Sequence, residues 1–128
     1  MKVLLDTCSF LWLAADDPQL SENARNVFRD PGNEIYLSAV SAWEIAVKHS
    51  LGRLVLPKPP LALFPDWREK RGILSLSLEE TAALYESRLP RLHNDPFDRM
   101  LICQSIVHGM ALLTPDSDIS KYPVHTLW

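Results

Sequence analysis

The chain has 128 residues, of which 47% are hydrophobic and 23% are charged, and its formal net charge at pH 7 is −3. This length allows one domain with a single core (residues 1–128), and the composition is that of an ordinary soluble globular protein. No apolar run approaches the roughly 20 residues of a membrane span, and the net negative charge argues against a general polyanion-binding protein.

The first fifteen residues resemble a signal peptide only superficially. Asp6 interrupts their apolar stretch, and the hydrophobic pattern continues into the rest of the chain, which predicts that this segment is part of the folded domain. The two cysteines, Cys8 and Cys103, lack a metal-binding spacing and are too few for a disulfide framework. We therefore expect a protein of the reducing cytoplasm.

In the first half of the chain, short apolar runs alternate with helical patterns. The run KVLLD is continuously apolar and suits a strand that is buried on both faces. Ser21 is a good N-cap for a helix, and Gly52 is a good terminator. The predicted elements are strands over 2–6 and 34–38 and helices over 10–15, 21–29 and 40–52.

The second half continues this alternation after a proline-rich connector over 56–60. Ser77 and Glu80 have the spacing of a capping box, and Asp95 with Pro96 has that of a helix start. Strands separated by helices predict a three-layer α/β/α fold with a parallel central sheet of about five strands. The predicted elements are helices over 61–71, 77–88 and 96–108 and strands over 72–77, 111–114 and 124–128.

Four carboxylates fall near the same edge of the predicted sheet. Asp6 ends the first strand, and Asp116 follows the strand over 111–114. Glu44 lies in the helix after the second strand, and Asp98 lies in the first turn of the helix that precedes the fourth. Because ligands of open α/β sheets bind beyond the carboxyl ends of the strands, the four side chains are expected to converge on one pocket.

Each carboxylate also has an ordinary structural interpretation. Asp6 could cap the next helix, and Asp116 could stabilise a turn. Glu44 precedes Lys48 by four residues, the favourable order for an ion pair on a helix. Asp98 lies in the first turn of its predicted helix, where the helix dipole alone would favour an acidic side chain.

The joint pattern favours a metal site over these separate interpretations. Two unit negative charges about 4 Å apart repel by roughly 4 kcal/mol at the effective dielectric of a protein surface, so four converging carboxylates need a cation. Mg²⁺ or Mn²⁺ is the expected ion, because hard divalent cations take carboxylate, water and phosphate oxygens. The residues therefore suggest metal-dependent phosphodiester chemistry.

The motifs resemble those of PIN-domain ribonucleases, specifically VapC-type toxins of type II toxin–antitoxin modules. The resemblance covers the chain from end to end and in order. The matching segments are LLDTCSFLWL (4–13), VSAWEIAVKHSLGRLVLP (40–57), HNDPFDRMLICQS (93–105), LLTPDSDISKYPV (112–124) and the terminal LW.

The resemblance implies a PIN-like α/β/α fold and endonucleolytic cleavage of RNA that depends on Mg²⁺ or Mn²⁺. Catalytic and metal-binding roles carry over onto Asp6, Glu44, Asp98 and Asp116. Attack of a metal-activated water would leave 5′-phosphate and 3′-hydroxyl ends. The resemblance also implies inhibition by a VapB-type antitoxin and assembly as a homodimer. One departure is Cys8, which stands where close relatives commonly have histidine.

RNA binding by a protein of net charge −3 requires local cations. Lys48 and Arg53 are candidates, and the run over 68–71 is by default a solvated helix face. Arg99, beside Asp98, is the strongest candidate, with a surface ion pair as its alternative interpretation.

Three rival functions share some of these features, and each lacks support from one part of the sequence. A phospho-acceptor receiver domain would need an aspartate at the end of the third strand, and GILSLS offers none. A phosphatase of the DxD type would need an acid where Cys8 stands. A catalytically silent interaction module would keep the fold only to bind the antitoxin, which the complete set of four acids makes the less favoured interpretation.

Overall fold

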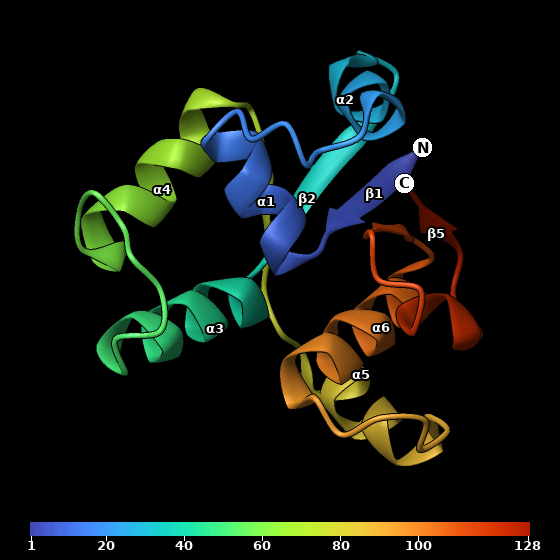
Figure 1. Ribbon diagram of the computed structural model, residues 1–128. Coiled ribbons are helices and arrows are strands. Elements are labelled where there is room, and N and C mark those ends of the chain that lie inside the picture. Colours follow the sequence, from blue (N-terminus) through green and yellow to red (C-terminus); the bar gives the residue numbers. More distant parts are fainter.

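The computed structural model describes residues 1–128, which fold around a five-stranded sheet in the order β3-β2-β1-β4-β5 (Figure 1). All four neighbouring strand pairs are parallel, as predicted. The second strand has the predicted bounds, and the other four are shorter than predicted, the third and the fifth by three residues each. The strands are β1 (Lys2–Leu5), β2 (Glu34–Ser38), β3 (Leu74–Leu76), β4 (Ala111–Leu113) and β5 (Thr126–Leu127).

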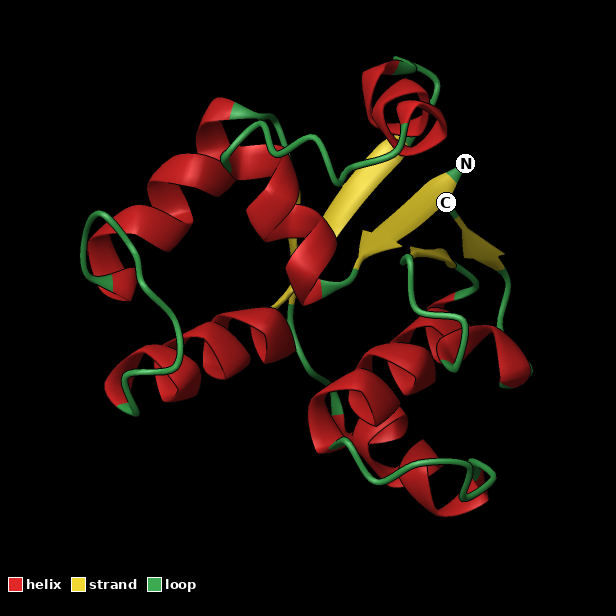
Figure 2. Cartoon of the chain, viewed as in Figure 1, coloured by secondary structure: helices red, strands yellow, loops and turns green.

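Helices cover both faces of this sheet, which confirms the predicted three-layer α/β/α fold. Figure 2 shows α1, α2 and α4 on one side of the strands and α5 and α6 on the other. Two short 3₁₀ turns lie over Glu86–Arg88 and Ile119–Lys121. The helices are α1 (Thr7–Ala14), α2 (Glu22–Arg29), α3 (Ala39–Ser50), α4 (Pro60–Lys70), α5 (Glu80–Tyr85) and α6 (Pro96–His108).

The central strand β1 separates two hydrophobic cores. Val3 and Leu5 belong to the core under α1 and α2, and Leu4 belongs to the core under α6. All three side chains are fully buried, because successive side chains of a strand point to opposite faces and both faces are covered. β1 is therefore a rigid base for whatever follows its carboxyl end.

Helix α1 begins earlier than predicted, directly after β1. Asp6 is its N-cap, and its carboxylate accepts a hydrogen bond from the backbone N–H of Ser9 at 2.7 Å. This interaction satisfies one of the orphan donors of the first turn, so the helix starts at Thr7 rather than near residue 10. Asp6 is consequently fixed in position by the fold itself.

The capping box predicted at Ser77 and Glu80 is wrong. The helix begins at Glu80 with Glu79 as an N-cap that makes no side-chain capping bond. The backbone carbonyl of Ser77 instead accepts a hydrogen bond from Gln104 Nε2 of α6 at 3.2 Å. This bond to α6 fixes Ser77 ahead of the helix.

No helix of the structure combines the length and the apolar character needed to cross a membrane.

Candidate active site

The pairing of β1 with β4 brings two chain segments together at the carboxyl edge of the sheet. The backbone N–H of Asp6 donates to the carbonyl of Leu113 at 3.1 Å, so Asp6 lies beside the turn that contains Asp116. Glu44 reaches this edge from α3, and Asp98 reaches it from the first turn of α6. The first and fourth strands are neighbours in the sheet, which is the condition for Asp6 and Asp116 to meet at one edge.

A small pocket of about 180 Å³ lies at this edge, and all four predicted carboxylates line it. The larger hollows elsewhere on the surface are lined by at most one carboxylate each. The residues that line the acid pocket are Asp6, Thr7, Cys8, Glu44, Lys48, Asp95, Asp98 and Asp116.

Asp95 is a fifth carboxylate of the acid pocket, and the sequence analysis assigned it only a capping role. That role is confirmed: its side chain accepts hydrogen bonds from the backbone N–H groups of Phe97 and Asp98 at 2.9 and 3.1 Å. A cap lies next to the first turn that it stabilises. Its position beside Asp98 could have indicated that its charge also acts on the pocket.

The carboxyl group of Asp98 is strongly perturbed by its surroundings in the pocket. Burial is the largest cause, and the negative charges of Asp95, Glu44, Asp6 and Asp116 add to it, so that the pKa of Asp98 rises to about 7. Burial and like charges both disfavour the ionised carboxylate. The mutual repulsion expected from the sequence is therefore one of the causes of this pKa shift.

Asp6 serves the fold and the pocket at once. It is only 4% exposed, and this burial raises its pKa, against hydrogen bonds from Ser9, Thr114 and Cys8 that favour the carboxylate. Both interpretations of Asp6, as helix cap and as pocket carboxylate, are thus correct. Asp116 combines two roles similarly, because it accepts a hydrogen bond from the backbone N–H of Asp118 at 2.9 Å while lining the pocket.

The two carboxylate oxygens of Glu44 have different partners. Thr7 Oγ1 donates to Oε1 at 2.6 Å, and Lys48 Nζ pairs with Oε2. Thr7 Oγ1 also lies 3.0 Å from Ser41 Oγ. The ion pair with Lys48 predicted from the helical spacing is confirmed, and it lies inside the acid pocket rather than on an open helix face.

Cys8 contacts the same pocket through its thiol. Its Sγ lies 3.5 Å from both carboxylate oxygens of Asp6, to which it can donate a weak hydrogen bond. Burial and the charge of Asp6 raise the pKa of Cys8 well above its ordinary value. A thiol that keeps its proton is a poor nucleophile, which disfavours a reactive role for Cys8.

The chemistry of the pocket fits a hard divalent cation. Its lining offers carboxylate and hydroxyl oxygens, and only one cationic side chain stands among five carboxylates. No three His, Cys, Asp or Glu side chains are close enough together to hold an ion as they stand. This spacing agrees with mutual repulsion, so an ion in the pocket would need water as part of its ligand set or a movement of the carboxylates.

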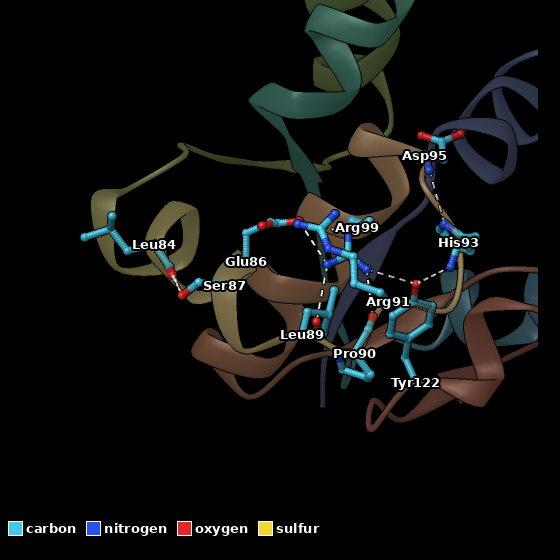
Figure 3. A network of polar contacts seen from close by, with 10 residues as sticks. All are labelled: Leu84, Glu86, Ser87, Leu89, Pro90, Arg91, His93, Asp95, Arg99 and Tyr122. Carbon is cyan, nitrogen blue, oxygen red and sulfur yellow. Dashed lines mark hydrogen bonds and ion pairs between the residues drawn. The ribbon is translucent and has the colours of Figure 1, made fainter.

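Arg99 does not face the pocket, and the expectation that it is an exposed side chain is wrong. Its side chain is 2% exposed. Figure 3 shows its guanidinium enclosed by an ion pair with Glu86 at 2.9 Å and by hydrogen bonds to the carbonyls of Leu89 and Pro90. It also donates to Tyr122 Oη at 3.2 Å. Arg99 is therefore part of the protein's internal framework.

This Arg99 network, formed by Arg99, Glu86, Tyr122 and the carbonyls of Leu89 and Pro90, supports the loop that leads into α6. Tyr122 Oη accepts a hydrogen bond from the backbone N–H of His93 at 3.0 Å, and His93 Nδ1 lies 3.3 Å from the backbone nitrogen of Asp95 (Figure 3). A chain of contacts thus runs from the buried guanidinium to the cap of α6.

Among the basic residues considered for RNA contact, only Lys48 lines the acid pocket. The run over 68–71 lies on α4 and its C-terminal end. There Lys70 pairs with Asp66, and Arg71 donates to the backbone carbonyls of Trp67 and Ala14. The interpretation of this run as a solvated helix face is correct for Lys70, whereas Arg68 and Arg71 are partly buried and donate to backbone carbonyls.

Known proteins resemble this chain in both sequence and fold. Ribonuclease VapC22 of Mycobacterium tuberculosis is 29% identical over an alignment of 132 positions, gaps included, that covers 98% of each chain. Ribonuclease VapC16 of the same organism is 39% identical over 66 residues, and this match spans 48% of the present chain and 47% of VapC16.

Two crystal structures extend the fold comparison. VapBC2 from Rickettsia felis, bound to a DNA fragment from its promoter, gives a TM-score of 0.74 at 12% identity, covering 99% of this chain and 98% of the other. DNA-bound VapBC from Salmonella typhimurium gives 0.72 at 16% identity, covering 99% and 97%. At these identities the two matches establish the fold alone.

A sequence profile of the PIN domain matches residues 3–124, almost the whole chain. The resemblance drawn from the motifs is thereby confirmed, and the chain belongs to the PIN-domain family.

Proposed function

We propose that this protein is a Mg²⁺- or Mn²⁺-dependent endoribonuclease, the toxin of a type II toxin–antitoxin module. The observation that carries the proposal is the convergence of Asp6, Glu44, Asp98 and Asp116 on one small pocket. Burial first, and the negative charges of its neighbours in addition, raise the pKa of Asp98 to about 7, as expected for a carboxylate in a cation-binding site. The two relatives named as VapC ribonucleases support the choice of substrate.

The four carboxylates have complementary roles in this proposal. Asp6 is held by its capping bond, and Glu44 is oriented by Thr7, so both present oxygen ligands from fixed positions. Asp98, whose pKa is near 7, releases its proton when the pocket takes up an ion. A bound Mg²⁺ or Mn²⁺ supplies a Lewis acid for the phosphate and helps a water to lose its proton.

The remaining chemistry follows from in-line attack of water on the RNA backbone. The bond between phosphorus and the 3′ oxygen breaks, so the products carry 5′-phosphate and 3′-hydroxyl ends. Cys8 donates its weak hydrogen bond to Asp6 and so leaves the carboxylate as an oxygen ligand. The set of four acids is complete although Cys8 replaces the histidine that is common at this position in close relatives.

The proposed partners follow from the family. A VapB-type antitoxin encoded alongside would inhibit the nuclease, and the structural neighbours described as VapBC complexes support this pairing. A homodimer and a location in the cytoplasm complete the proposal. Co-expression with the neighbouring open reading frame, followed by purification through a tag on the toxin, tests the pairing. A protein that copurifies and suppresses RNA cleavage is the expected result.

A cleavage assay with matched variants tests the activity. Wild type and Asp98→Asn are incubated with end-labelled RNA in Mg²⁺ and in EDTA. Asp66→Asn serves as the control, because Asp66 is a carboxylate that pairs with Lys70 on α4, outside the pocket. We expect Mg²⁺-dependent cleavage by wild type and by the control, and cleavage near background for Asp98→Asn.

The same assay distinguishes the rival functions. Equal cleavage by wild type and Asp98→Asn would point to a contaminating nuclease. No cleavage by any of the proteins, together with firm antitoxin binding, would favour the catalytically silent interaction module. Either result contradicts the proposed nuclease.

A further inference from the structure

We propose that Lys48 is the built-in counter-ion of the acid pocket, and that it transfers from Glu44 to a substrate phosphate when a divalent ion enters. The inference rests on the proposed function and adds to it a residue that both competes with the ion and helps to bind RNA. Lys48 is the only cationic residue among those that line the pocket. Five carboxylates face this single positive charge.

The geometry makes Lys48 the movable member of its ion pair. Its side chain is 44% exposed, whereas that of Glu44 is 6% exposed. The Glu44 carboxylate is also held by Thr7, whose hydroxyl lies 2.6 Å from Oε1. Lysine has a flexible four-carbon stem that ends in a compact charge. A change in the charge of the pocket would therefore shift the ammonium rather than the carboxylate.

Both oxygens of Glu44 have partners in the structure. Oε1 accepts from Thr7, and Oε2 accepts from Lys48. An ion that uses Glu44 as a ligand, through either oxygen, places a second cation on the carboxylate that already holds the ammonium. Two cations on one carboxylate repel each other. Entry of the ion therefore weakens the hold of Glu44 on Lys48.

A released ammonium at this position has a suitable second partner. Lys48 lies on α3 one turn after Glu44, so it stays at the pocket where an RNA phosphate would meet the carboxylates. Lysine is a common phosphate ligand, and the rest of the pocket lining offers only acids, hydroxyls and a thiol. In this account Lys48 offsets part of the negative charge of the pocket before the ion binds, and part of the charge of the phosphate afterwards.

The proposal predicts effects of opposite sign on the two ligands. Removing the charge of Lys48 should tighten the binding of Mn²⁺, because a competitor is lost, and should weaken the binding of RNA, because a phosphate contact is lost. A residue that only supported the fold of α3 would weaken both. The opposed signs therefore separate the proposed role from a structural one.

The experiment uses the full-length protein and the variant Lys48→Met, which keeps the length of the side chain without its charge. Mn²⁺ affinity is measured by isothermal titration calorimetry in the absence of RNA, and KM and kcat are measured separately for RNA cleavage. Lys70→Met is the matched control, because Lys70 also forms an i,i+4 pair, with Asp66, but lies outside the pocket. Lys48→Arg tests whether the charge suffices.

We expect Lys48→Met to bind Mn²⁺ roughly tenfold more tightly, the effect of removing one charge near contact distance in a partly exposed site. Its KM for RNA should rise several-fold. Lys70→Met should match wild type, and Lys48→Arg should restore the RNA affinity. Lys48→Gln provides a second neutral side chain should Lys48→Met fold poorly.

Unchanged or weaker Mn²⁺ binding by folded Lys48→Met or Lys48→Gln would overturn the role of Lys48 and leave the proposed nuclease intact. Unchanged KM with tighter Mn²⁺ binding would also overturn it, since the transfer to phosphate would then be absent. Failure of wild type to bind Mn²⁺ at all would contradict the proposed function and this inference together.

Discussion

Asp98 and Arg99 are neighbours in the first turn of α6, yet their environments are opposite. Asp98 faces four other carboxylates, and its pKa is raised to about 7. Arg99 is buried against an oppositely charged glutamate, two carbonyls and a tyrosine hydroxyl. The same turn of α6 thus carries the guanidinium of Arg99, which has ionic and hydrogen-bonding partners, and the carboxylate of Asp98, whose ionised form is disfavoured by its surroundings.

The difference indicates which region maintains the fold and which is available for a ligand. A buried charge with a full set of partners is costly to disturb, because removing one member strands the others. Carboxylates crowded without a cation reduce stability instead, and a bound cation recovers that loss. The Arg99 network holds the loop before α6 in place, and this loop positions the start of α6, which carries Asp95 and Asp98 of the acid pocket.

The largest effect should come from breaking the Arg99 network. Arg99→Met leaves Glu86 and the backbone carbonyls of Leu89 and Pro90 without their partner, so we expect the free energy of unfolding to fall by about 3 kcal/mol or more. Urea denaturation measures this loss. Arg91→Met is the control, because Arg91 is exposed and lies 3.6 Å from the same glutamate; it should have little effect. Equal losses from both variants would contradict the special status of Arg99.

The next largest effect should be a gain of stability from neutralising Asp98. The ionised form is penalised in the fold, because the pKa of Asp98 is raised from 3.8 to about 7. The penalty is complete above pH 7, shrinks as the pH falls through 7, and vanishes below about pH 4. Asp98→Asn should therefore be more stable than wild type by about 1–3 kcal/mol at pH 8 in EDTA.

Denaturation of both proteins over a pH series measures this gain, and the advantage of Asp98→Asn should narrow between pH 8 and pH 5. Addition of Mn²⁺ should reverse the order, because only wild type retains the full set of carboxylates. A variant less stable than wild type at pH 8 in EDTA would show that Asp98 is satisfied by its surroundings, as Arg99 is.

Thr7→Val should lower the stability of the fold by less than Arg99→Met does. It removes the hydroxyl that contacts Glu44 and Ser41. The buried Glu44 carboxylate would lose a charge-assisted hydrogen bond, which costs about 1–3 kcal/mol. Thermal denaturation monitors the fold, and calorimetry monitors Mn²⁺ affinity, which should also fall. Thr81→Val, at an exposed threonine of α5, is the control and should leave both values unchanged.

The smallest effect should come from Asp95→Ser, which keeps a capping oxygen at the start of α6 and removes the charge next to Asp98. Serine caps helices about as well as aspartate does, so stability should change by less than about 1 kcal/mol. The pKa of Asp98 should fall, since the charge of Asp95 helps to raise it. Carboxyl ¹³C NMR follows that titration, and an unchanged pKa would remove Asp95 from the pocket's electrostatics.

Much of the site could be predicted because sheet topology converts sequence position into spatial position. Asp6 ends a continuously apolar strand, and Asp116 follows another, so parallel pairing brought them to one edge. The i,i+4 pair of Glu44 and Lys48 and the cap at Asp95 followed equally from local rules.

The parts that sequence reasoning missed depend on tertiary partners. Arg99 differs from Asp98 by one position, about 100° around the helix, and its burial depends on Glu86 and on the path of a loop that no periodicity specifies. Ser77 has the spacing of a cap, but its backbone carbonyl is bound by Gln104 from another helix. Local propensity was overridden by packing at both positions.

The proposed function requires that the carboxylates of the acid pocket lie close together in order to bind a divalent cation. Titration of the Asp98 carboxyl carbon by ¹³C NMR, with and without Mg²⁺, tests this claim most directly. We predict a midpoint near pH 7 in EDTA that moves down by more than one pH unit in saturating Mg²⁺. A midpoint near pH 4 under both conditions would contradict it, because the charge of Asp98 would then need no cation.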